Sequence, residues 1–246
     1  MNNINNEKGF TLVELAIVMT IIGLLIGGIL KGQELVANSR LTKTYADIRS
    51  YRAAVLTFED MYNALPGDLR NAGGRLVDCN VLASCNNAGG NGDGFIGTPN
   101  IANWSRNDQS ANLSEPTQFW VHLALADLIS GIDVQNNQRW GNLYPSAPIG
   151  GGFQVLHALE VNVNNAAGHF YVLRSLPTGD PHPDNPNDAV LTPTQMVTLE
   201  GKYDDLVGNT GSIISDDNAS NCWNPANGAY NTANNDSDCL SAYKFF

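Results

Sequence analysis

The sequence predicts an α+β protein in which a long N-terminal helix packs on a loop-rich antiparallel sheet. Three features predict this fold: an apolar run of 21 residues at 10–30, a helical pattern over 34–63, and a remainder rich in Asn, Gly, Pro and Asp that contains a strand hairpin. The chain has 24 acids against 13 bases, a formal charge of −11. That balance argues against a nucleic-acid-binding protein, which needs a basic face.

The apolar run is long enough to cross a membrane as a helix, about 31 Å at 1.5 Å per residue. Its single charge is Glu14, and an acid in hydrocarbon normally indicates a function and a partner. The alternative is a glutamate that reaches the headgroups near a helix end. In a secretory signal the small-residue cleavage site follows the apolar run, whereas here Gly9 precedes it. Cleavage at Gly9 would keep the helix and give Phe10 an α-amino group, the natural counter-charge for Glu14.

The helical pattern continues beyond the apolar run as an amphipathic stalk. Its apolar residues share one stripe, at Leu41, Tyr45, Ile48, Val55 and Tyr62. Pro66 and Gly67 end the helix. The expected organisation is a leader at 1–9, a transmembrane or filament-core helix at 10–33, a stalk helix at 34–63 and a globular head at 64–246.

The head is predicted to hold two further helices and a hairpin. Ser114 is a good N-cap for a helix that opens at Glu115-Pro116 and closes at Gly131. The alternating segments 153–163 and 169–176, joined by an Asn- and Gly-containing turn, predict two antiparallel strands. Thr192-Pro193 opens a short helix through about Tyr203.

The stretch KGFTLVEL at Lys8–Leu15 resembles the processing site of type IV prepilins and type II secretion pseudopilins. In that family prepilin peptidase cuts after the glycine and methylates the new N-terminal residue. The resemblance implies a pilin fold, cleavage between Gly9 and Phe10, and N-methylation of Phe10. It also implies that Phe10 and Glu14 set the register between neighbouring subunits during assembly.

Three later stretches resemble a subgroup of large pilin-like proteins. They are Tyr62–Asp68, the segment 90–94 followed by 119–124, and Lys202–Asp205 before Gly211. That subgroup usually has a glycine after the paired aspartates, where this chain has Leu206. This departure bears on the local geometry of the turn and not on the class of protein.

The resemblance implies a structural subunit of a type IV pilus-like filament, assembled from the inner membrane through helix bundling and serving adhesion, motility or DNA uptake. The implied partners are prepilin peptidase, an inner-membrane assembly platform and further copies of the chain in a helical filament. The implied location is the bacterial inner membrane with the head in the periplasm, then a cell-surface pilus or a periplasmic pseudopilus.

Two alternatives stay open. One is a pseudopilin that drives protein export in a type II secretion system. The other is a membrane-anchored module that binds a glycan or a partner through Trp104, Trp140 or Trp223. An enzyme is not expected, because the sequence has no G-K-[ST] phosphate loop, no H-E-x-x-H and no G-x-S-x-G.

The four cysteines fall into two local pairs, six and seventeen residues apart. If the head is exported, this spacing favours the disulfides Cys79–Cys85 and Cys222–Cys239. The competing interpretation is a zinc site, but no spacing is C-x-x-C and no histidine lies nearby in the sequence. The second pair is similar in place to the disulfide-bounded region of many type IV pilins.

Calcium is the one cofactor that the sequence suggests. Asn91 and Asp93 resemble the middle of a calcium loop, with oxygen ligands two residues apart and a glycine for the turn. Asp204 and Asp205 are another candidate pair. The alternative at 91–94 is a turn built from Asn, Asp and Gly, which that composition favours.

Overall fold

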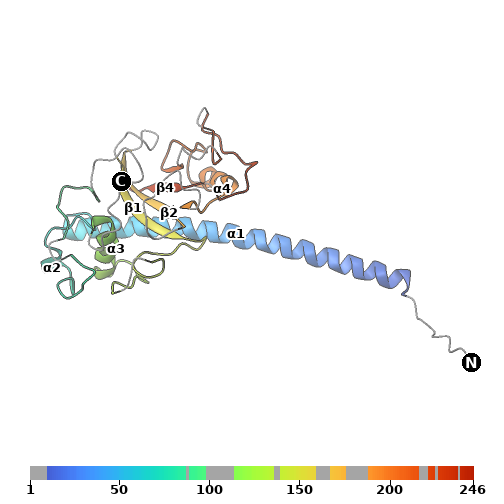
Figure 1. Cartoon of the computed structure of the whole chain (residues 1–246), viewed down its shortest axis with the longest axis horizontal. Coiled ribbons are helices and arrows are strands. Elements are labelled where there is room, and N and C mark those ends of the chain that lie inside the picture. The colour runs from blue at the N-terminus through green and yellow to red at the C-terminus, as the bar shows by residue number, and fades with distance from the viewer. Residues whose placement is uncertain are drawn as a thin grey trace, which may run out of the picture. The chain divides into compact units, whose positions relative to one another are not determined.

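The computed structural model describes residues 10–86, 89–97, 114–135, 139–158, 167–175, 188–215, 221–224, 227–237 and 239–246. The chain divides into two compact units, residues 1–40 and residues 41–246. Helix α1 (Leu12–Tyr62) runs through both units (Figure 1). Its residues up to Arg40 belong to the first unit, and residues 41–62 are the first element of the second. A long N-terminal helix and a four-stranded antiparallel sheet confirm the predicted α+β fold.

The part of α1 in the second unit packs on the core along one stripe. Its buried residues recur on one face of the helix, at Leu41, Thr44, Ile48, Ala54, Val55 and Phe58. Tyr45, Tyr51 and Tyr62 are partly buried beside them. The helix ends where Asn63 takes a left-handed conformation (φ 49°), shortly before Pro66. Of the predicted stripe, Leu41, Ile48 and Val55 are buried and Tyr45 and Tyr62 are partly buried, and the helix ends just before the predicted Pro66 and Gly67.

The sheet has the strand order β1-β2-β4-β3, with every neighbouring pair antiparallel. Its strands are β1 (Gly152–Ala158), β2 (Gly168–Arg174), β3 (Ile213–Ser215) and β4 (Ser241–Lys244). The predicted hairpin is present as β1 and β2, in a register that places His157 opposite His169. The segment between them, 159–166, lies outside the described residues.

Both faces of the sheet are buried. One face contributes Phe153, Val155, Tyr171, Leu173 and Tyr243 to the main core, which α1 and α3 (Glu115–Leu125) also build. The other face forms a second apolar cluster of Leu156, Phe170, Val172, Ile214, Leu240 and Ala242. The central strand β2 is therefore apolar on both sides, unlike a sheet with one solvated face.

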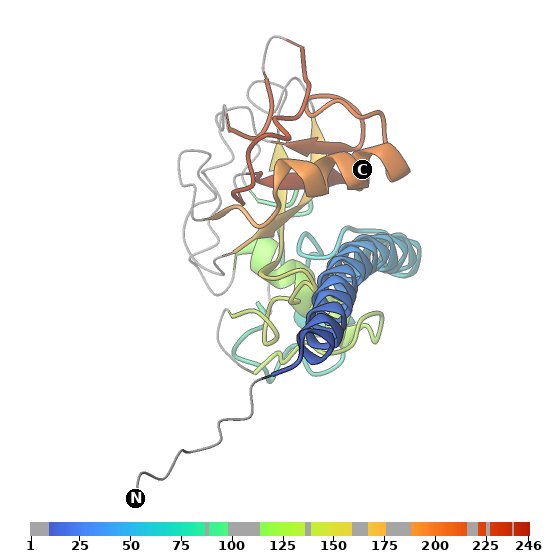
Figure 2. The ribbon, with the colours of Figure 1, turned by 90° about the vertical axis from the view of Figure 1, so that its right-hand side faces the viewer.

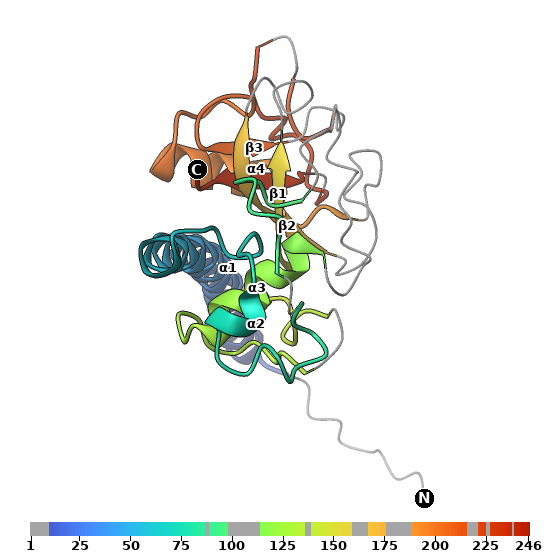
Figure 3. The ribbon, with the colours of Figure 1, turned by 90° about the vertical axis from the view of Figure 1, so that its left-hand side faces the viewer.

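Three shorter helices complete the second unit: α2 (Ala72–Arg75), α3 and α4 (Pro193–Tyr203). α3 and α4 lie toward opposite ends of the sheet (Figures 2 and 3). α4 begins as predicted, because Thr192 and Gln195 form a reciprocal capping box. The stacked rings of Tyr45 and Tyr203, with centroids 3.8 Å apart, join α4 to α1.

The predicted end of α3 at Gly131 was wrong. The helix stops at Leu125, and two residues later Asp127 takes a left-handed conformation (φ 59°). The Leu128 N–H donates to the Leu123 carbonyl at 3.1 Å, and the Asp127 N–H donates to the Ala124 carbonyl at 3.1 Å. These bonds form a Schellman-type helix end. An aspartate at this position is a weaker sequence signal than the glycine further along the chain.

Two disulfides connect the cysteines in the pairs that their spacing favours. Cys79 is bonded to Cys85 and Cys222 to Cys239, with Cα atoms 5.2 and 5.1 Å apart. All four cysteines are buried, and none is free. No thiolate therefore remains in this state to act as a zinc ligand or a nucleophile.

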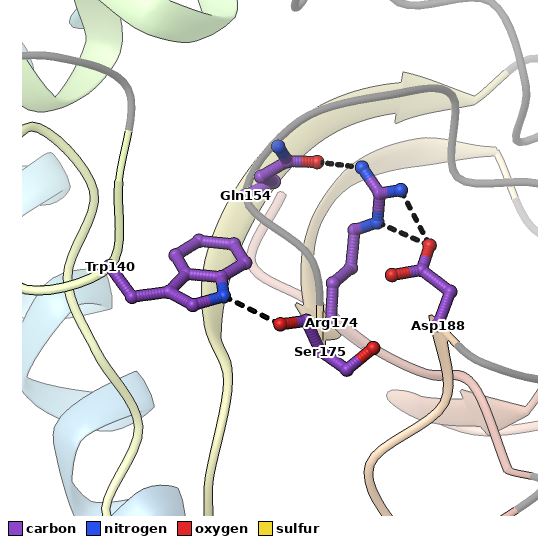
Figure 4. A network of polar contacts seen from close by, with 5 residues as sticks. All are labelled: Trp140, Gln154, Arg174, Ser175 and Asp188. Carbon is purple, nitrogen blue, oxygen red and sulfur yellow. Dashed lines mark hydrogen bonds and ion pairs between the residues drawn. The ribbon is translucent and has the colours of Figure 1, made fainter.

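A buried ion pair ties β1 and β2 to the segment that precedes α4 (Figure 4). The guanidinium of Arg174 donates to Asp188 Oδ2 from Nε at 2.7 Å and from its terminal nitrogen at 2.5 Å, and it also donates to Gln154 Oε1. Trp140 Nε1 donates to the carbonyl of the adjacent Ser175 at 2.8 Å. Arg174 and Asp188 are each 1% exposed, so the two charges neutralise each other within the fold.

Candidate functional site

The N-terminal end of α1 is organised around Glu14. Thr11 donates to Glu14 Oε2 from both its N–H and its hydroxyl, each at 2.9 Å, while the Glu14 N–H donates to the Thr11 hydroxyl at 3.3 Å. This reciprocal pattern is a capping box, because Thr11 precedes the helix and Glu14 follows it by three residues. The carboxylate is thereby held at the start of α1, four residues along the chain from Phe10. Gly9 lies outside the described residues.

The described part of the first unit presents a long apolar surface. Every residue from Phe10 to Arg40 is exposed, and Phe10 itself is 89% exposed. By length and composition, α1 can cross a membrane. Open space surrounds four glycines along it, since a Cβ added to any of them would meet no heavy atom within 4 Å: Gly23, Gly27, Gly28 and Gly32. These small residues leave room for the close approach of another helix.

In the second unit, the turn Leu65–Asp68 is fixed by α3. The Gly67 N–H donates to Nδ1 of His122 at 2.9 Å, and a Cβ at Gly67 would lie 2.4 Å from the Glu115 carbonyl oxygen. Burial lowers the pKa of His122 to about 3, so its imidazole stays neutral and can accept this hydrogen bond. The turn is therefore part of the core packing of the head.

The loop 90–97 packs on this turn through two acids. Asp68 accepts hydrogen bonds from the Gly92 and Gly94 N–H groups, the latter at 2.8 Å. Glu115 accepts from the Asn91 N–H at 3.0 Å and from the Gly97 N–H at 2.8 Å. Two of the three stretches that resemble the pilin-like subgroup therefore meet at one place and hold each other in position.

The candidate calcium residues Asn91 and Asp93 use their side-chain oxygens within the loop itself. Asn91 Oδ1 accepts from the Asp93 N–H at 2.8 Å, and Asp93 Oδ1 accepts from the Phe95 N–H at 2.9 Å. Asn91 Nδ2 also donates to Asp93 Oδ2 at 2.9 Å. This is the geometry of an Asx turn. Calcium binding at this loop stays a prediction.

A second acidic group lies at the end of α4. One carboxylate oxygen each from Glu200, Asp204 and Asp205 lies within 4.8 Å of the other two. The sequence suggested Asp204 and Asp205 as a candidate pair, but Glu200 was not expected. Its burial is a tertiary property, since it comes from the packing of α4 against Tyr230, thirty residues further along the chain.

A cavity of about 540 Å³ lies between the end of α1 and the C-terminus, and its lining includes Glu59, Arg70, His169 and Phe246. The His169 ring lies beside that of His157, with centroids 4.6 Å apart. Burial lowers the pKa of both imidazoles, that of His169 to about 4. Both rings are therefore neutral near pH 7.

The tryptophans proposed to bind a glycan or a partner are not displayed on the surface of the described head. Trp223 is 1% exposed, and Trp140 is half-buried with its indole N–H bonded to Ser175. Trp104 lies outside the described residues. The two described rings therefore serve packing, which is the commoner role of tryptophan in a fold.

Comparison with known proteins gives one match, at the N-terminus. Residues 4–30 match the family described as the prokaryotic N-terminal methylation motif. No curated protein and no solved structure matches the chain. The matched segment contains Gly9, Phe10, Glu14 and the whole apolar run at 10–30.

This motif is the signature of prepilin-type proteins, the class of type IV pilins and pseudopilins that prepilin peptidase processes. The chain carries this signature, followed by an apolar N-terminal helix and an α+β head. The resemblance of the N-terminal stretch to prepilin-type proteins is thereby confirmed. The apolar helix and the motif together are consistent with a protein anchored in the inner membrane.

Proposed function

We propose that the chain is a structural subunit of a type IV pilus-like filament. Prepilin peptidase would cut between Gly9 and Phe10 and methylate Phe10. The subunit would wait in the inner membrane, with its head in the periplasm, until an assembly platform adds it to a helical filament of identical chains. Its work is mechanical and does not include catalysis.

The observation that supports this role is the exposed apolar surface of residues 10–30 with a single acid at its start. In the membrane this surface contacts lipid, and in a filament it would contact the helices of other subunits. Glu14 would pair with the α-amino group of Phe10 in a neighbouring subunit. A subunit inserted out of register would leave both charges unpaired in an apolar environment, which is strongly unfavourable.

Glu14→Ala tests this assignment in cells that express the chain with its assembly machinery. We expect cleavage at Gly9 to continue while incorporation into filaments, measured by immunoblotting of sheared filaments, is lost. Glu34→Ala is the matched control, because Glu34 is an exposed acid on the same helix that pairs with Lys31 three residues before it. Normal incorporation of Glu14→Ala would contradict the register role.

A pseudopilin of a type II secretion system is the second candidate. The same motif supports it, because the signature is common to pilins and pseudopilins. The disulfide at Cys222–Cys239, near the C-terminus, favours the pilin. Deletion of the gene separates the two functions: loss of surface filaments supports the pilus, and loss of protein export with surface filaments intact supports the pseudopilus.

A further inference from the structure

We propose that Glu200, Asp204 and Asp205 bind a divalent cation, and that the cation is calcium. Glu200 lies in the last turns of α4, and the two aspartates follow the helix directly. One oxygen of each carboxylate lies within 4.8 Å of the other two, close enough for a single ion to contact all three. The site is independent of the filament role and of the loop at Asn91 and Asp93.

In the described part of the chain, one carboxylate oxygen of Glu200 is buried without a hydrogen-bond partner. Its side chain is fully buried, and Oε1 accepts a hydrogen bond from the Tyr230 hydroxyl at 2.8 Å. Oε2 is also buried and has no hydrogen-bond partner among the described residues. A buried carboxylate oxygen without a partner is costly, and in native proteins such a group normally has one. Because this carboxylate shares its space with those of Asp204 and Asp205, a cation satisfies it directly.

The loop after α4 holds the two aspartates in place before any ion binds. Asp204 Oδ2 accepts from the N–H groups of Ser212 and Ile213 at 2.7 and 2.6 Å. Asp205 accepts from the Val207 N–H at 3.0 Å and from the Thr210 hydroxyl at 2.5 Å. A carboxylate that is already fixed loses little conformational freedom on binding an ion.

Within the described residues, the three carboxylates of this group have no ion pair with a basic side chain. Burial raises the pKa of Glu200 to about 8, and the two neighbouring aspartates contribute to the rise, while the hydrogen bond from the Tyr230 hydroxyl and the nearby backbone N–H of Leu206 oppose it. A bound cation would reverse this effect by favouring the ionised carboxylate.

Calcium fits the donor set. The three residues offer only carboxylate oxygens, which hard cations prefer, and they include no cysteine or histidine that would favour zinc or copper. Calcium accepts six to eight oxygens in a flexible geometry, so water can complete the site on the exposed side of Asp205. Magnesium requires a more regular octahedron and gives up its water less readily.

The test uses the full chain in detergent, freed of metal with EGTA and kept at pH 8. Isothermal titration calorimetry with calcium chloride should give one calcium per chain. The melting temperature should rise by about 5 °C at a hundredfold excess over the dissociation constant. Glu200→Gln and Asp205→Asn should each weaken binding at least about tenfold, because each removes one charged ligand.

Asp93→Asn is the matched control and should bind calcium as the unaltered chain does. The proposal is overturned if the unaltered chain takes up no calcium, or if both variants at the site bind it normally. It is also overturned if Asp93→Asn abolishes binding, which would place the ion at the 90–97 loop, or if magnesium binds equally well. Asp205 is exposed, so its variant keeps the test valid should Glu200→Gln fail to fold.

Discussion

Leu206 occupies a backbone conformation that favours glycine. Its φ is 69°, in the left-handed region, and its side chain is 51% exposed. This is the position at which the pilin-like subgroup usually has a glycine after the paired aspartates. A side chain costs roughly 1–2 kcal/mol in this conformation, whereas glycine adopts it freely. Leu206 is therefore strained in a conformation that glycine would adopt freely.

Replacement of this residue should stabilise the head. We predict that Leu206→Gly raises the free energy of unfolding by about 1 kcal/mol, because it removes the side-chain clash in the left-handed region. Thermal unfolding of the full chain in detergent measures the change. Leu206→Ala is the control and should show no such gain, since its Cβ meets the same clash. A Leu206→Gly variant less stable than Leu206→Ala would contradict this account of the turn.

Glu200 should make stability depend on pH when no calcium is present. Its pKa of about 8 in the folded chain lies above the ordinary 4.5, so the folded state holds the proton more tightly than the unfolded state. That contribution to stability is complete below about pH 4.5 and is lost as the pH rises through about 8. The groups that face Glu200 are Asp204, Asp205, Tyr230 and Tyr243.

The corresponding measurement is the melting temperature in EGTA between about pH 4.5 and pH 8.5. We predict that the unaltered chain loses stability across this range and that Glu200→Gln, which stays neutral, loses less. Glu34→Gln, at an exposed acid, should follow the unaltered chain. Parallel curves for Glu200→Gln and the unaltered chain would contradict a proton held on Glu200.

Residue-level features divide into those that sequence can predict and those that it cannot. The cysteine pairs follow from local spacing, and Gly9, Phe10 and Glu14 follow from a contiguous motif. The burial of Glu200 and the hydrogen bond from Gly67 to His122 depend on partners that are distant in the sequence. The spacing of Asn91 and Asp93 fits a calcium loop, yet in the fold their side-chain oxygens accept hydrogen bonds from backbone N–H groups.

At the scale of elements, the helices and strands that sequence predicts are those with a long periodic pattern or a capping box. Helices α1 and α4 and the hairpin of β1 and β2 have long periodic patterns or a capping box, and sequence predicts them. Strands β3 and β4 have three and four residues, too few for a periodic signal. They form because β2 offers an edge for pairing: β4 occupies that edge, and β3 pairs with β4.

The Arg174–Asp188 pair joins elements that are separated in the sequence. We predict that Asp188→Ala lowers the free energy of unfolding by about 3–5 kcal/mol, because it leaves the buried Arg174 charge without its partner. Asp47→Ala breaks the exposed pair with Lys43 and should cost less than about 1 kcal/mol. Chemical denaturation of the second unit within the full chain measures both changes.

A double replacement separates the charge from its packing. Arg174→Met combined with Asp188→Leu removes both charges and should recover much of the stability lost in Asp188→Ala. Equal losses in Asp188→Ala and Asp47→Ala would show that the buried pair adds nothing beyond an exposed one. That result would contradict a structural role for the hydrogen-bonded group of Arg174, Asp188 and Gln154.

At the scale of the whole molecule, two kinds of surface divide the chain. Residues 10–30 are apolar and exposed with one acid, whereas residues 76–246 carry seventeen acids against five bases. The first surface is suited to lipid and to other helices, and the second to water. The formal charge of −11 therefore belongs to the head, and Glu14 is the one charge of the apolar segment.

The mass of the mature N-terminal peptide tests the central claim most directly. We predict that chains isolated from assembled filaments begin at Phe10 and carry one methyl group on its α-amino nitrogen. This result would establish processing after Gly9 and would place the α-amino group four residues before Glu14 in the chain. A final product that begins at Met1, or one cut after the apolar helix, would contradict the account of this chain as a processed filament subunit.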